Sequence, residues 1–198
     1  MEKAHVEALD RWVTKESMHE AVGVWEDIIS RHPRDELAVK FAHDAYFFLV
    51  PSALRWLWRI VKTTSHRLFP SQQGKAPEMK QSLDRVLGEW ERSVSNEHMF
   101  GYLLGMSAFS LEENLWYANT ALASGIPHAR THDLFFRTIS YEQAERRAKA
   151  ALAINPRDTW SIHALAHVHE MQGKQEEGIN FLTEEMANWK VFLNEREG

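Results

Sequence analysis

Apolar side chains recur along this chain every three or four residues, which is the spacing of an amphipathic α-helix. The two clearest segments, residues 18–35 and 141–158, align without a gap at an offset of 123 residues, as from Pro33 to Pro156. Each segment predicts a helix that ends at a Pro, followed by an Asp suited to cap the next helix, Asp35 or Asp158. The chain therefore contains an internal repeat.

The segments that follow the two turns also share a helical pattern. Apolar positions after the first turn are Leu37, Val39, Phe41, Ala42, Ala45 and Tyr46, and after the second they are Trp160, Ile162, Leu165, Ala166 and Met171. Gly173 then marks a turn, and a further helix is expected over about 175–189 with Ile179, Leu182 and Met186 on one face. Gly101 and Gly105 suit close packing between helices. The expected fold is all-α, built from antiparallel helix pairs.

Two stretches interrupt the repeat pattern, which resumes in register after each. We expect a helical repeat unit at 1–50, an irregular inserted segment at 51–81, a helical continuation at 82–115, a second inserted segment at 116–140, a C-terminal helix-pair unit at 141–190 and a tail at 191–198. We interpret both insertions as retained non-coding or alternatively spliced segments. If translated, the first is a disordered loop with a short helix over 54–61, and the second is helical near 116–124.

Residues 16–49 and 141–182 resemble the tetratricopeptide repeat protein 38 family, and the strings AVKFAHDAYFFL, GYLLGMSAFSLEEN and AINPRDTWSIHALAHVHEMQG carry the resemblance. It implies an α-solenoid of tetratricopeptide-like antiparallel helix pairs, and it implies that the chain is a fragment of a longer protein. In such repeats the first helix of each unit lines a concave groove. The resemblance places these residues there: Lys40, Asp44, Tyr102, Phe109, Trp160, His163, His167 and Glu170, with Phe47, Phe48, Gly105, Glu112 and Met171 beside them.

Composition narrows the classes of partner. The chain has 198 residues and a formal net charge of −5, so no basic excess indicates nucleic-acid binding. Cysteine is absent, which excludes thiol catalysis and a disulfide framework and suits a cytoplasmic location. The longest apolar run, residues 45–54, is much shorter than the ~20 residues that a membrane helix needs. We therefore expect a soluble protein with a protein or peptide partner.

The string HALAHVHE holds the strongest candidate chemistry. His163 and His167 are four residues apart and share a helix face, and Glu170 follows one turn later. Two imidazoles and a carboxylate are what a zinc site with an open position takes from a protein. However, the Glu does not lie between the two His residues, as it does in the HExxH motif of zinc proteases. We expect no metal and no cofactor, with these side chains lining the groove and His169 in the core.

His43 and Asp44 form a second candidate, because an Asp beside a His can orient it as a general base. Sequence neighbours on a helix point in different directions, so a buried His with satisfied hydrogen bonds is the preferred interpretation. The expected function is a non-enzymatic scaffold that binds a protein or peptide partner on its concave face. The alternative is a metal-dependent or His-based hydrolase that uses HALAHVHE, with ligands completed by His43, Asp44 or helices beyond this chain.

Overall fold

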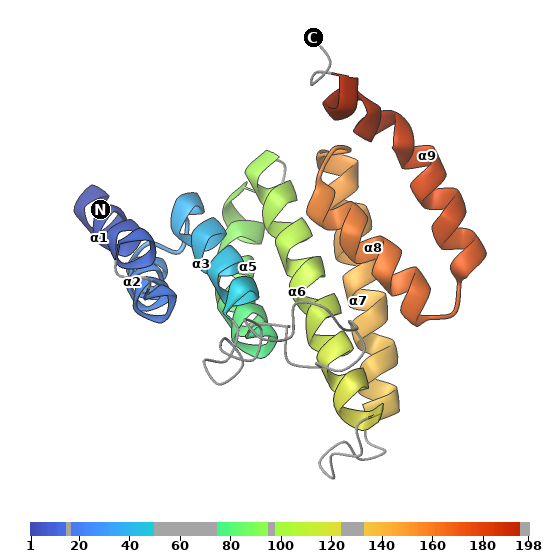
Figure 1. Ribbon diagram of the computed structural model, residues 1–198, viewed down its shortest axis with the longest axis horizontal. Coiled ribbons are helices and arrows are strands. Elements are labelled where there is room, and N and C mark those ends of the chain that lie inside the picture. Colours follow the sequence, from blue (N-terminus) through green and yellow to red (C-terminus); the bar gives the residue numbers. More distant parts are fainter. Residues whose placement is uncertain (15–16, 50–74, 95–97, 124–132, 195–198) are drawn as a thin grey trace, which may run out of the picture. The chain divides into compact units, whose positions relative to one another are not determined.

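The computed structural model describes residues 1–14, 17–49, 75–94, 98–123 and 133–194, and these residues form α-helices without a β-strand (Figure 1). The expected all-α class is confirmed for this part of the chain. The chain divides into two compact units, Met1–Trp90 with Trp116–Ala129, and Glu91–Leu115 with Arg130–Gly198. The helices are α1 (Glu2–Val13), α2 (Met18–Arg31), α3 (Glu36–Phe48), α5 (Ala76–Val94), α6 (His98–Ala123), α7 (Asp133–Ile154), α8 (Thr159–Met171) and α9 (Gln175–Asn194).

The α2–α3 and α7–α8 turns have the same backbone hydrogen bonds. In each turn, the residue before the Pro donates its N–H to the carbonyl four residues earlier, and the capping Asp donates its N–H to the carbonyl of the residue before the Pro. The N···O distances are 2.7 Å (His32 to Ile28) and 2.9 Å (Asp35 to His32) in the first turn, and 2.7 Å (Asn155 to Ala151) and 3.0 Å (Asp158 to Asn155) in the second. The repeat seen in the sequence is thus also a repeat of local structure.

Aromatic side chains form the core of the first unit. Trp25 is fully buried and stacks on Phe41 with ring centroids 5.3 Å apart, and Trp12 meets Trp25 edge-on at 5.5 Å. Trp90 of α5 is also buried and donates its indole N–H to the carbonyl of Pro33 at 2.8 Å. This bond attaches α5 to the turn between α2 and α3.

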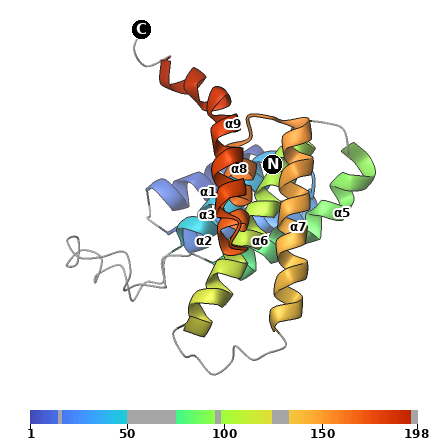
Figure 2. The same ribbon diagram turned by 90° about the vertical axis from the view of Figure 1, so that its right-hand side faces the viewer.

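Small side chains allow the helices of the second unit to pack closely. Ala144, Ala148 and Ala151 of α7 are all fully buried, and they share one face of the helix at intervals of three and four residues. Ala144 belongs to a core cluster with Val168 of α8. Figure 2 shows α7, α8 and α9 of this unit from a second direction.

Several boundaries differ from the sequence-based expectation. α5 begins at Ala76, so 76–81 is helical rather than irregular. Within the second inserted segment, 116–123 belongs to α6, which confirms the helix expected there. In contrast, 133–140 belongs to α7, and α9 continues into the expected tail as far as Asn194. The predicted helix over 54–61 lies outside the described residues. None of the helices in the described ranges combines the length and apolar character that crossing a membrane requires.

Candidate functional site

Two histidines on α8 form the centre of the candidate site. Asp158 caps the helix, because its side chain accepts a hydrogen bond from the N–H of Trp160 at 3.3 Å. This start of the helix puts His163 and His167 on one face, with their rings stacked at 4.4 Å between centroids and 17° between planes. The predicted imidazole pair is therefore present.

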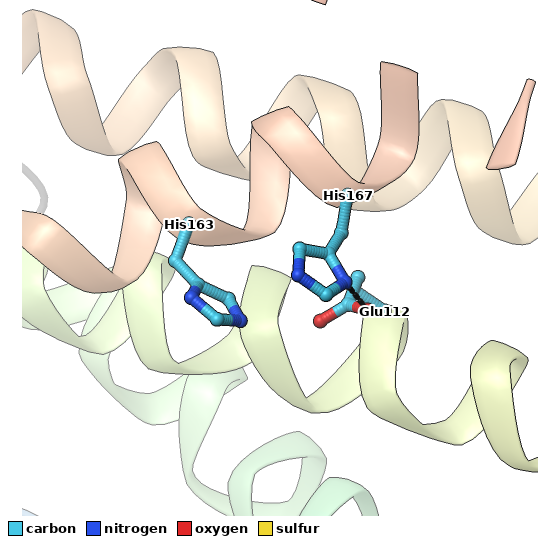
Figure 3. A group of neighbouring side chains, drawn as sticks. All are labelled: Glu112, His163 and His167. Atoms are coloured by element: carbon cyan, nitrogen blue, oxygen red, sulfur yellow. Dashed lines mark ion pairs between the residues drawn. The ribbon is translucent and has the colours of Figure 1, made fainter. Parts of the chain in front are cut away.

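Glu112 of α6 is the third member of the cluster. Both imidazoles project from α8 towards α6, where Glu112 meets them (Figure 3). One ligand-type atom from each of the three residues can be chosen so that all lie within 4.8 Å of one another. All three residues belong to the second compact unit. The carboxylate beside the histidines thus comes from a different helix than the sequence suggested.

The carboxylate of Glu112 is completely buried. Its Oε1 lies 3.0 Å from Nδ1 of His167, which is an ion-pair distance. Neither of its oxygens accepts a hydrogen bond of acceptable geometry within the described part of the chain. Burying a carboxylate without hydrogen-bond donors is costly, so a cationic partner would stabilise its charged form.

The surroundings shift the pKa values of these groups in different directions. Burial, together with a smaller effect of the neighbouring His167, lowers the pKa of His163 to about 4. The contact with Glu112 raises the pKa of His167 against the opposing effect of burial. Burial raises the pKa of Glu112, and burial together with repulsion from Glu112 raises the pKa of Glu113 to about 7. A pKa of about 4 leaves His163 neutral at neutral pH, with a lone pair on one ring nitrogen.

Aromatic side chains border the cluster on one side. Phe109 is fully buried, and its ring lies 4.5 Å from Trp160 and 5.3 Å from His163 between centroids. Trp160 is partly accessible, and Tyr102 is 43% exposed. Phe109 was predicted to line the groove, but it is buried and packs against the rings of Trp160 and His163 instead.

The remaining predicted residues lie outside the cluster. Glu170 is exposed on α8 and is not one of the three converging side chains. Lys40 and Asp44 belong to the first unit, where they form an ion pair on α3. His43 is buried, and its Nδ1 lies 3.1 Å from Oδ1 of Asp44. A ring enclosed in this way cannot reach a substrate from its present position.

Glu112 is the residue whose role sequence reasoning missed, because that reasoning placed it on the groove and not among candidate ligands. The available signal was the pair Gly101 and Gly105. A Cβ at Gly101 would overlap Asn155, and one at Gly105 would overlap the side chains of Asp158 and Ser161. The glycine face of α6 is thus the face against the start of α8, and Glu112 lies two turns further along it.

A scan of the sequence against models of known protein families finds no match. Interpretation of the site therefore depends on its geometry and chemistry.

Proposed function

We propose that this chain is a non-enzymatic helical-repeat scaffold that binds a protein or peptide partner. One observation carries the proposal: the two helices related by the offset of 123 residues leave the same face accessible. This face has five positions on each helix, and none of them is buried. The positions are Leu37, Lys40, Asp44, Phe47 and Phe48 on α3, and Trp160, His163, His167, Glu170 and Met171 on α8. We call these the α3 face and the α8 face.

The opposite sides of the two helices are buried at equivalent positions. Val39, Ala42 and Ala45 of α3 are core residues, and so are their counterparts Ile162, Leu165 and Val168 of α8. Since only one side of each helix packs in the core, packing does not determine which residues stand on the other side. The repeat that defines the core also defines the accessible faces.

The accessible faces mix aromatic, apolar and ionisable side chains. Aromatic side chains supply much of the binding energy at protein interfaces, and charged neighbours select the partner. Such a surface suits an extended peptide better than a phosphate backbone, which would need a basic face. The proposal includes antiparallel helix pairs of tetratricopeptide type, membership of the tetratricopeptide repeat protein 38 family, and a cytoplasmic location.

The test is selection of ligands from a displayed random-peptide library against the full chain, followed by fluorescence anisotropy with the selected peptides. We expect Trp160→Ala or Leu37→Ala to weaken the peptides that use the corresponding face by about tenfold or more, which is about 1.4 kcal/mol. Arg146→Ala serves as the control, because Arg146 is exposed on α7 outside both faces. If no selected peptide is sensitive to either face, the scaffold proposal is wrong.

A metal-dependent or His-based hydrolase is the second candidate function. It is favoured by the position of Glu112 beside His163 and His167, because a carboxylate and two imidazoles can activate water. Turnover of ester or peptide substrates that disappears in His163→Ala would support it. A rate that the substitution leaves unchanged would assign the turnover to a contaminant.

A further inference from the structure

The geometry of the second unit points to a metal site: we propose that Glu112, His163 and His167 bind one divalent transition-metal ion, zinc by preference. Imidazole nitrogen and carboxylate oxygen are common zinc ligands, and three protein ligands leave a fourth position for water or a partner's donor group. This inference does not depend on the proposed peptide binding, because it concerns a metal ion bound by the three side chains themselves.

The distances require only side-chain movement. Ligand atoms around a tetrahedral zinc ion lie about 3.3 Å apart, given bonds of about 2.0–2.1 Å. The three candidate atoms already lie within 4.8 Å of one another. Rotation of the two rings out of their stack directs one nitrogen of each towards Glu112, while α6 and α8 keep their places. Binding the ion therefore replaces the 4.4 Å ring stack by convergent nitrogens.

The buried carboxylate supplies an independent observation. Glu112 is 0% exposed, and no hydrogen bond of acceptable geometry reaches either of its oxygens from the described residues. One imidazole at 3.0 Å offsets part of the cost of burying this charge. A dication placed between the carboxylate and both rings provides the missing partner. The carboxylate of Glu112 faces the rings of the two histidines (Figure 3).

His163 distinguishes a metal site from a simple structural ion pair. A pair between Glu112 and His167 would need one imidazole, yet a second ring is stacked against the first. His163 is also exposed, so one of the proposed ligands faces solvent directly. The cluster is thus buried on the α6 side, at Glu112, and exposed to solvent on the α8 side, at His163.

The first measurement uses the full chain without a histidine tag. Elemental analysis of the purified protein and calorimetric titration of the chelator-stripped protein with zinc chloride give the stoichiometry and the affinity. We expect one zinc ion per chain and a higher melting temperature with zinc than with chelator, because an ion that binds only the folded state stabilises it. Absence of stoichiometric zinc binding to the wild-type protein would overturn the proposal.

Variants then assign the ligands. We expect His163→Ala, His167→Ala and Glu112→Gln each to weaken zinc binding by at least about a hundredfold, since loss of an outer-shell partner alone costs ten- to a hundredfold. Glu170→Gln and the double variant Lys40→Ala/Asp44→Ala are matched controls with unchanged affinity. The first removes the acid that the sequence suggested, and the second alters the repeat-equivalent positions of His163 and His167.

Two results with these variants would contradict the proposed ligands. Retention of wild-type affinity in His163→Ala, which alters an accessible side chain and leaves the core intact, would show that zinc binds another part of the surface. Loss of affinity in Glu170→Gln with retention in Glu112→Gln would contradict the assigned carboxylate. Circular dichroism of each variant confirms that it is folded before its affinity is compared.

Discussion

At the scale of single residues, Asp35 and Asp158 occupy equivalent positions but interact with different groups. Asp35 accepts a hydrogen bond from the N–H of Ala38 at 2.9 Å and lies 3.0 Å from the ring of His5. Asp158 accepts from the N–H of Trp160 and from the hydroxyl of Ser161. Both stabilise the start of a helix, and Asp35 also connects α1 to the turn.

Asp35 gives a prediction about the pH dependence of stability. Burial raises the pKa of Asp35, but the N–H of Ala38 and the His5 ring outweigh it and hold the pKa below the ordinary 3.8. The charged carboxylate therefore stabilises the fold above pH 3.8, and this contribution is lost as the pH falls through the lowered pKa. We expect Asp35→Ala to cost about 1 kcal/mol at pH 7 and less at strongly acidic pH.

Urea unfolding of the wild type and the variant at several pH values measures this difference. Asp35→Asn is the control, because Asn caps a helix without a charge, and its effect should change less with pH. An unchanged cost of Asp35→Ala down to the lowest pH would show that the carboxylate charge contributes nothing.

At the scale of helices, the glycines of α6 determine how closely it approaches α8. The contacts of Gly101 and Gly105 with the α7–α8 turn leave no room for a Cβ. The same face of α6 continues through the buried Ala108 to Glu112. The register of the two helices therefore places the carboxylate opposite the imidazoles.

We expect Gly105→Ala to destabilise the second unit by about 1–3 kcal/mol, because its methyl group would overlap the side chains of Asp158 and Ser161. The matched control is Gly23→Ala in the interior of α2, where nothing lies within 4 Å of an added Cβ. There we expect stabilisation by about 0.5–1 kcal/mol from reduced backbone entropy of the unfolded chain. Thermal unfolding of both variants measures the difference, and destabilisation of equal size in both would contradict it.

Local patterns were sufficient to predict part of the site. The four-residue spacing of His163 and His167 determines that they share a face, and the structure places them in contact. Glu112 lies 51 positions before His163 in the sequence, so its approach depends on how two helices pack. The turns of the repeat were predictable because Pro and Asp act within a few residues. The extent of α5, α7 and α9 was not, since tertiary packing extends helices through weakly periodic sequence.

At the scale of the whole molecule, α9 carries an apolar stripe on its outer side. Ile179, Leu182 and Met186 share a face as predicted, but they are 64%, 39% and 49% exposed. α9 instead packs through Gly178, which lies against His169, and Phe181, whose ring centroid is 6.1 Å from that of His169. Periodicity identified the stripe without showing which side of the helix faces the core.

We expect the triple substitution of Ile179, Leu182 and Met186 by Gln to change the free energy of unfolding by less than about 0.5 kcal/mol per site, because the stripe is solvent-exposed. It should also reduce concentration-dependent self-association, which exposed apolar patches promote. Sedimentation velocity and urea unfolding measure the two effects. Leu165→Gln is the contrasting control, since Leu165 is 2% exposed and its replacement should be strongly destabilising.

The repeated α2–α3 and α7–α8 turns have a consequence for how such a chain diverges after a segment is duplicated. Lys40 and Asp44 in one copy stand where His163 and His167 stand in the other, while the capping Asp and the buried positions of the core are kept. Substitutions at accessible positions usually change the stability of a fold little, so selection can act on them through binding. Two copies of one local structure can therefore present different side chains for binding while the backbone stays the same.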